Sequence, residues 1–267
     1  MGRERFSLRS ICRGLHEPPA LKRDCCVRVP EEIIKYPDPA TYDVDSVFGA
    51  GGTPTFNSPD ISTVHVWPMR PIDNLTGVIR NLSADASAQR TRVDMSWSAF
   101  GIGLQRLPLA SFFVDLARAG FPGSERSVSW PLPPALKDAN RYGIFMDIAH
   151  PYDRDLTNNA GQQTVDGMQT SQGRSKTFVV PVRNPLNSVQ LVNMTLAPEP
   201  TASWATVAPA AFSLAPGAQQ NVLVSINVPE GEPVSPPGTL VSATIELMAF
   251  AGSVLFGGVS FIVLLDA

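Results

Sequence analysis

The amino-acid sequence predicts an all-β protein in which two tandem β-sandwiches follow an extended N-terminal arm. Three observations lead to this fold class. The chain combines 25 prolines with only 17% charged residues, a balance typical of many short strands joined by turns. Several stretches alternate apolar and polar residues with the period of a strand. A polar stretch near the middle of the chain separates two such sets, which predicts a boundary between two domains.

The first 58 residues show no sustained period, and we interpret them as a largely irregular arm. Turn signals such as YPDPATYD and FGAGGTPTFNSPD are typical of extended chain. Residues 1–28 hold seven Arg or Lys against three acidic residues, so the rest of the chain is acidic. All three cysteines lie here, and the adjacent pair lacks the spacing of a zinc site or a redox motif. The role of these cysteines stays open: Cys12, Cys25 and Cys26.

Residues 59–166 are predicted to form the first sandwich. The stretches RTRVDMSW and YGIFMDIAH each place apolar side chains on one face and polar ones on the other. The segment SFFVDLARAG (111–120) departs from this pattern. We interpret it as a short helix with Phe113, Val114 and Ala117 facing inward.

Residues 167–267 are predicted to form the second sandwich, after the polar junction DGMQTSQGRSK (166–176). KTFVVPVRNP and NVLVSINVP alternate in the same way. The stretch LMAFAGSVLFGGVSFIVLL (247–265) has about the length of a membrane span. Its period of two and the central AGS turn instead predict a β-hairpin, so we expect no membrane span.

The charge and the motifs argue against several functions. A net charge of -3 gives no reason to expect a nucleic acid partner. The first 24 residues hold no apolar run of the roughly 7–15 residues that a secretory signal needs, so we expect a cytoplasmic protein or one exported by a non-classical route. Only three histidines could act as a base near neutral pH, and neither G-x-S-x-G nor H-E-x-x-H is present. We therefore expect no catalytic, cofactor-binding or metal-binding residues.

The stretch HPYDRDLTNNAGQQT (150–164) concentrates polar side chains between two predicted strands. Aspartate and asparagine hold turns by bonding nearby backbone groups. We predict a turn at one end of the first sandwich, held by bonds from these side chains to backbone amides within the loop. Calcium binding at Asp153–Asn159 stays open as an alternative, because the ion takes about six to eight oxygen ligands from such loops.

Two segments resemble known bacterial immunoglobulin-like domains. Residues 60–165 resemble the CARDB-type domain in a V-x-M-x-W strand and in a late turn with Asp153, Asn158, Asn159 and Gln162. Residues 170–267 resemble the NEW3- or hydin-type domain in FVVPVRNP, Trp204, LAPGAQQNVLVSINVP, PPGT and FGGVSF. The resemblance implies immunoglobulin-like sandwiches of the kind found in surface, adhesion and enzyme-accessory proteins.

These features predict a non-enzymatic structural protein, one subunit of a larger assembly or filament. Its partners would be other copies of itself or another protein of the same assembly. We expect the arm to dock on a neighbouring subunit by strand addition, in which main-chain hydrogen bonds give the affinity. The predicted pairing segment is EEIIKYPDPATYDV (31–44), with these anchors: Ile33, Ile34, Tyr36 and Tyr42.

The alternative is a glycan- or protein-binding adhesion module without self-assembly. A sugar-stacking site needs exposed aromatic side chains on a sheet face or a loop. Trp97 and Trp204 fall where a sandwich core takes its tryptophan. The candidates for a ligand face are therefore Trp67, Trp130 and Tyr152.

Overall fold

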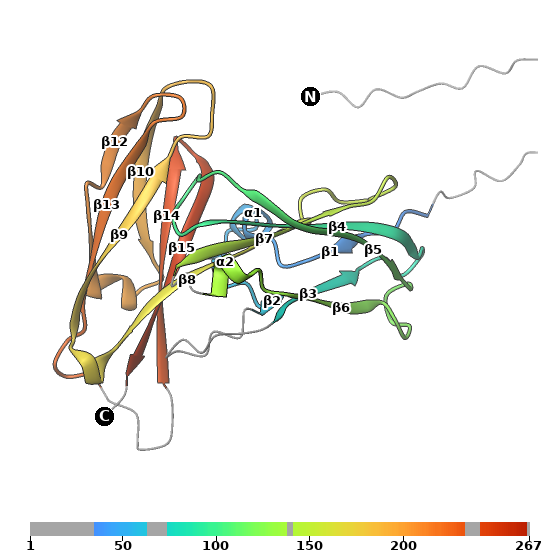
Figure 1. The fold of residues 1–267 in the computed structure, drawn as a ribbon, viewed down its shortest axis with the longest axis horizontal. Coiled ribbons are helices and arrows are strands. Elements are labelled where there is room, and N and C mark those ends of the chain that lie inside the picture. The colour runs from blue at the N-terminus through green and yellow to red at the C-terminus, as the bar shows by residue number, and fades with distance from the viewer. Residues whose placement is uncertain (1–34, 63–73, 138–140, 233–240, 266–267) are drawn as a thin grey trace, which may run out of the picture. The chain divides into compact units, whose positions relative to one another are not determined.

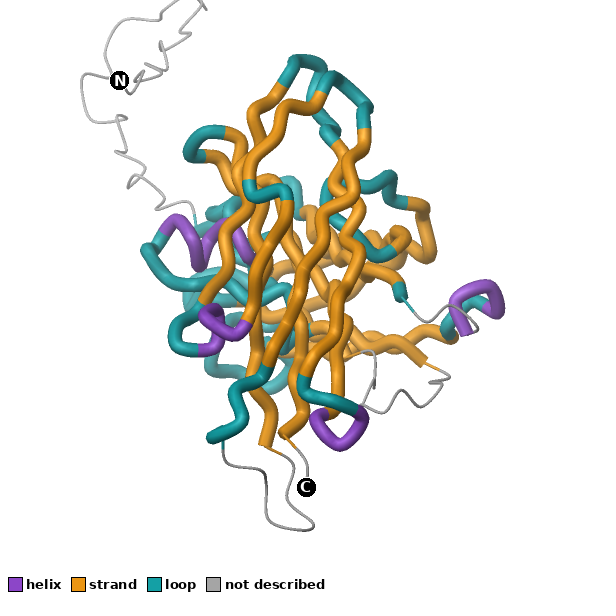
Figure 2. Tube along the Cα trace, turned by 90° about the vertical axis from the view of Figure 1, so that its left-hand side faces the viewer, coloured by secondary structure: helices purple, strands orange, loops and turns teal. Residues whose placement is uncertain are grey.

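The computed structural model describes residues 35–62, 74–137, 141–232 and 241–265. Strands make up most of this part of the chain (Figure 2), and the predicted all-β class is confirmed. The strands form three sheets. Four short helices join them: α1 (Val44–Gly49), α2 (Pro134–Lys137), η1 (Thr170–Gln172) and η2 (Thr201–Trp204).

The largest sheet has eight strands in the order β12-β10-β14-β15-β8-β7-β4-β5 (Figure 1). Its neighbours are antiparallel, except that β15 and β8 are parallel. The strands are β4 (Ala88–Ala99), β5 (Leu107–Leu116), β7 (Tyr142–Ala149), β8 (Ala160–Gln169), β10 (Gln190–Ala197), β12 (Ala211–Leu214), β14 (Val241–Ala251) and β15 (Val254–Leu265).

Two smaller sheets each enclose a core against one half of the large sheet. In the first, β3 (Asn74–Asn81) pairs with β6 (Glu125–Pro131) on one side and with β1 (Pro39–Ala40) and β2 (Ile61–Ser62) on the other. In the second, β13 (Gln219–Asn227) lies between β11 (Ala205–Ala208) and β9 (Ser175–Arg183). The buried positions follow the alternation seen in the sequence. The first core includes Leu75, Ile79, Met95, Ile144 and Met146, and the second includes Val180, Val222, Val224, Ile245 and Phe261.

Strand β8 belongs to both sandwiches. Its first half pairs with β7, from Asp147↔Ala160 to Gly143↔Thr164. Its second half pairs with β15, from Ser260↔Val165 to Leu264↔Gln169. The predicted junction (166–176) therefore holds the end of this shared strand, the helix η1 and the start of β9. One continuous hydrogen-bonded sheet links the two cores.

Two local predictions have opposite outcomes. The C-terminal hairpin is confirmed, since β14 and β15 are antiparallel and join at Gly252. The helix over 111–120 is wrong, because most of this segment lies in β5 and pairs with β4. Leu116 is fully buried while Phe113 is 59% exposed, which is a strand pattern. Among the described residues, no helix is long and apolar enough to cross a membrane.

Candidate functional site

The segment 36–62, which we call the strap, lies against its own chain. β15 pairs only with the second half of β8, and the strap lies along the first half, where β15 makes no ladder with it. Thr164 N donates to Phe56 O (2.8 Å), and Thr41 N donates to Asn158 O (3.0 Å). Asn57 forms an isolated bridge with Gln163. The strap thus satisfies backbone groups that the divergence of two strands would leave unpaired.

Phe56 is the point at which the strap enters the second sandwich. Its ring is fully buried, in a small apolar cluster with Val44, Met248 and Leu255. A β-carbon on Gly258 would overlap this ring, so only glycine leaves room for it there. Close packing of this kind makes the fit depend on both residues.

A buried carboxyl group also binds the strap. Glu246, on β14, is 2% exposed, and its Oε2 accepts from Phe56 N (3.2 Å) and from Ser260 Oγ. No ion pair to Glu246 is found within the described residues. Burial raises the pKa of Glu246, and the hydrogen bonds from Ser260, Thr55 and Phe56 oppose this shift.

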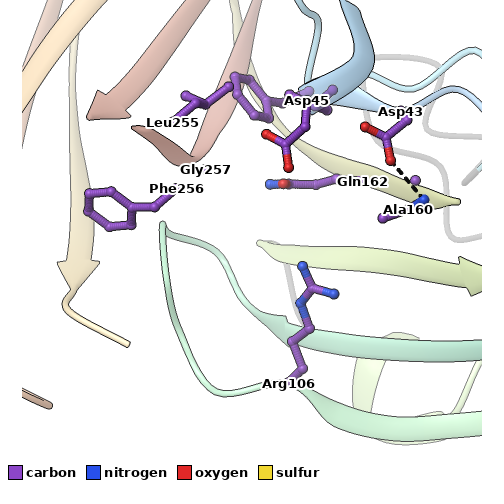
Figure 3. A pocket seen from close by; sticks show the side chains of 11 residues that line it. Asp43, Asp45, Arg106, Ala160, Gln162, Leu255, Phe256 and Gly257 are labelled. Atoms are coloured by element: carbon purple, nitrogen blue, oxygen red, sulfur yellow. Dashed lines mark hydrogen bonds between the residues drawn. The ribbon is translucent and has the colours of Figure 1, made fainter. Parts of the chain in front are cut away.

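A pocket of about 130 Å³ opens beside α1, between the strap and the two halves of the large sheet. Figure 3 shows Asp43, Asp45, Arg106, Gln162 and Phe256 around it. Asp43 is fully engaged, because Oδ1 accepts from Ser46 N (2.9 Å) at the start of α1 and Oδ2 accepts from Ala160 N (2.9 Å). Gln162 is engaged too, because its Nε2 donates to Thr164 Oγ1 (3.0 Å) and to Gly258 O (2.9 Å).

The charges at the pocket are mixed. The Arg106 guanidinium lies over the Phe145 ring at 3.9 Å and is 3.4 Å from Asp147 Oδ1. Burial raises the pKa of Asp147 although Arg106 lowers it, and burial together with the charge of Asp43 raises the pKa of Asp45. The guanidinium of Arg106 and the amide of Gln162 thus already have partners within the chain, and Asp45 is the charged side chain at the pocket that remains to face a ligand.

Reactive groups are few in the part of the chain that the structure describes. His150 is the one histidine there, and its Nε2 lies 3.1 Å from Gln89 O. No group of three or more His, Cys, Asp or Glu side chains among these residues could hold a metal ion.

The predicted arm anchors divide into three groups. Ile33 and Ile34 lie outside the described residues. Tyr36 is 41% exposed, and its carbonyl accepts from Ser83 Oγ (2.7 Å). Tyr42 is partly buried against the Phe56 cluster, and its hydroxyl accepts from Thr55 N (2.8 Å). Residues 36–58, counted in the arm from sequence, therefore make contacts within their own chain.

The predicted ligand-face aromatics do not share one environment. Trp67 lies outside the described residues. Trp130, on β6, is partly buried against the first core, with its ring 6.1 Å from that of Phe112. Tyr152 is 66% exposed in the turn after β7. Of the three, Tyr152 is the described side chain that presents its ring to solvent.

The 150–159 turn is held by its own carboxylates, as predicted for the aspartates. Asp153 Oδ1 accepts from Asp155 N (3.1 Å), and Asp155 Oδ1 accepts from Thr157 N (2.9 Å). The asparagines act differently from the prediction, because their side-chain amides donate to carboxylates. Asn159 Nδ2 donates to Asp153 Oδ2 (2.9 Å), and Asn158 Nδ2 donates to Asp38 Oδ1 (2.9 Å), which ties the turn to the strap.

The loop 100–104 is a second connection between the sandwiches, which sequence reasoning missed. Ile102 is 1% exposed in the second core although it follows β4 of the first. Its N donates to Pro181 O (2.9 Å), and its carbonyl accepts from Arg183 N (2.9 Å). A β-carbon on Gly103 (φ +67°) would overlap the Arg183 carbonyl. The feature of the sequence that could have pointed to this connection is the stretch FGIG, in which two glycines flank Ile102.

Comparison with known proteins finds similarity in structure alone. No family model matches the sequence, and no curated protein matches it. The chain is distantly similar in structure to an Escherichia coli alpha-2-macroglobulin activated by porcine elastase. The match has 13% identity and a TM-score of 0.28, and it covers 74% of this chain and 21% of the other. Red sea bream transglutaminase gives 10% identity, a TM-score of 0.28, and coverage of 82% and 32%.

A Porphyromonas gingivalis W83 protein of unknown function gives 11% identity and a TM-score of 0.26, with coverage of 73% of this chain and 93% of the other. The chain thus spans about a fifth of the alpha-2-macroglobulin and about a third of the transglutaminase. At TM-scores of 0.26–0.28, these likenesses carry no conclusion about this chain.

Proposed function

We propose that the protein is a non-enzymatic structural protein, one subunit of a larger assembly, whose N-terminal arm docks on a neighbouring subunit. The observation that carries this proposal is the eight-stranded sheet shared by both sandwiches. Main-chain hydrogen bonds cross the junction along β8, along the strap and at the loop 100–104. Such a junction resists bending more than a flexible linker does, as a rigid spacing unit of an assembly requires.

The docking part of the arm is the chain before Lys35. The strap is occupied within its own chain, so Tyr42 is not available as an anchor, whereas Ile33 and Ile34 remain candidates. The mechanism is strand addition to an open sheet edge of the neighbour. The resemblance of 60–165 to CARDB-type domains and of 170–267 to NEW3- or hydin-type domains is part of this proposal, since such modules occur in surface and adhesion proteins.

A second candidate is a glycan- or protein-binding adhesion module. Tyr152 and Leu156 favour it, because they are 66% and 74% exposed in one turn at the end of β7. Binding of the full chain to a glycan array, lost on Tyr152→Ala, would support this function.

Multi-angle light scattering of the full chain tests the proposal. We expect a weight-average mass that rises above that of the 28.7 kDa monomer across the micromolar range. A constant monomer mass throughout that range would contradict the assembly function.

A further inference from the structure

We propose that β5 is the sheet edge that accepts the N-terminal arm of a neighbouring copy. This inference rests on the proposed function and names the surface at which it acts. β5 is the outermost strand of the eight-stranded sheet, and no described strand pairs with its outer edge. An open edge presents unpaired N–H and C=O groups, which form a template for another chain.

The outer edge of β5 is weakly protected against pairing, since only one proline and a register shift that leaves Leu109 as an extra residue interrupt it, both near the start of the strand. No charged residue occurs from Leu107 to Val114, and the single proline, Pro108, is the second residue of the strand. Phe113 is 59% exposed and Leu107 is 42% exposed. Ten residues of strand present about 33 Å of edge. A long apolar edge of this kind favours a covering strand over water.

The other open edges of the described chain carry protecting features. β11 and β12 have four residues each, and Pro209 follows β11 directly. β6 begins with Glu125 and Arg126 and ends with Pro131. β9 is bridged by Ile102 near its end. Short strands, charges, prolines and covering loops all discourage pairing, so the comparison singles out β5.

The position of the strap indicates which segment occupies β5. The described chain begins at Lys35, near the end of β5. Ser83 lies between the two: its Oγ donates to the carbonyl of Tyr36, next to Lys35 (2.7 Å), and its own carbonyl accepts from the N of Ala119, which follows β5 (2.8 Å). At least 34 residues precede Lys35. At about 3.3–3.6 Å per extended residue, they are long enough to reach an adjacent copy.

The apolar side chains next to Lys35 favour the end of the arm as this segment. Charge does not select a segment, because both signs occur beside β5: Asp94 is paired with Arg92 (2.9 Å), and the Arg90 guanidinium lies over the Phe113 ring at 5.4 Å. Ile33 and Ile34 directly precede Lys35. In an added strand they would face opposite sides of the sheet, one of them beside the exposed Phe113. The inferred occupant is therefore the segment 27–34 of a second copy.

Three full-length double variants test this pairing by light scattering. The edge variant, Leu107→Lys with Phe113→Lys, adds the charges that protect natural edges. The arm variant is Ile33→Asp with Ile34→Asp. The control is Val189→Lys with Leu191→Lys, at side chains that are 66% and 59% exposed away from β5. We expect the control to assemble like the wild type, and the edge and arm variants to associate at least tenfold more weakly.

Mixing supplies the decisive step, because each variant keeps the part that the other lacks. The edge variant retains its arm and the arm variant retains its edge, so an equimolar mixture should form a 1:1 dimer although each is monomeric alone. Circular dichroism and melting temperatures of the variants establish that each is folded. A monomeric mixture would overturn the arm-to-β5 pairing.

Other outcomes separate the two proposals. A wild type that stays monomeric overturns the proposed function and this inference with it. Assembly lost in the arm variant but kept in the edge variant overturns β5 alone and leaves the function standing. Assembly lost in the edge variant but kept in the arm variant shows β5 pairing with β5 of a second copy, which overturns the arm as occupant.

Discussion

Replacing Phe56 by alanine should destabilise the protein strongly, because this side chain joins the strap to the second sandwich. The ring is fully buried and packs against Val44, Met248 and Leu255. Phe56→Ala keeps the backbone hydrogen bonds of residue 56 with Thr164 and Glu246. The variant therefore measures the contribution of the ring.

The expected magnitude follows from burial. A buried aromatic side chain removes roughly 150–250 Å² from water, which is about 4–6 kcal/mol at about 25 cal/mol per Å². The retained β-carbon and partial collapse of the site reduce the loss. We expect about 3–5 kcal/mol, in line with Phe→Ala substitutions in other cores.

Urea unfolding of the full chain, followed by circular dichroism, measures this loss as a lower midpoint at constant slope. Leu156→Ala is the control, because Leu156 is 74% exposed and should change stability by less than about 0.5 kcal/mol. A loss below about 1 kcal/mol for Phe56→Ala would refute the reasoning, since it would mean that the strap contributes little to the folded state.

Three more substitutions test separate features. Burial raises the folded-state pKa of Glu246 above its unfolded value of about 4.3, so the stability from its neutral form is complete below that pH and is lost as pH rises through the folded pKa. The glutamine of Glu246→Gln cannot ionise, so the urea midpoint of this variant should depend less on pH in that range than the wild-type midpoint does. An equal pH dependence in both proteins would contradict this. Ile102→Ala should cost about 2–5 kcal/mol because the side chain is 1% exposed in the second core, and a loss below about 1 kcal/mol would count against the loop as a connection. Asn159→Ala should cost about 0.5–2 kcal/mol through its bond to Asp153. The wild-type melting temperature should not respond to EDTA or millimolar calcium, and a calcium-dependent rise lost on Asp153→Ala would instead identify a metal site.

The sequence was informative where side chains alternate along one strand. Strands β4, β7, β9 and β13 lie where the apolar period predicts them, because each places one face in a core; on β7 the other face is largely covered as well, with Phe145 6% exposed under the Arg106 guanidinium. The hairpin of β14 and β15 was predicted for the same reason, with Gly252 at its turn. The helix prediction at 111–120 failed because adjacent apolar residues in SFFV fit both periods, and pairing with β4 decides between them.

The connections between the sandwiches could not be predicted from periodicity. β8 changes partner half-way along its length, and its polar sequence gives no sign of the change. Phe56 lies among turn residues, so its burial depends on Gly258, about 200 positions later in the chain. Such long-range fits are set by tertiary packing and leave only indirect traces, such as a glycine beside an apolar residue.

Among the proposed site residues, the sequence located side chains but not their surroundings. Tyr42 was predicted as an anchor of the arm and Trp130 as an exposed aromatic of a ligand face, and both prove to be partly buried. The pocket residues Asp45, Arg106 and Gln162 come from three separate elements, so no local motif could have joined them.

Amide hydrogen exchange of the full chain at low and high concentration tests the central claim most directly, namely that the arm of a neighbouring copy adds to the edge of β5. At concentrations where light scattering shows assembly, backbone amides within residues 107–116 should exchange at least tenfold more slowly than in the dilute protein. The edge strands β6 and β12 should exchange equally at both concentrations. Equal exchange of β5 in dilute and assembled samples would contradict the account.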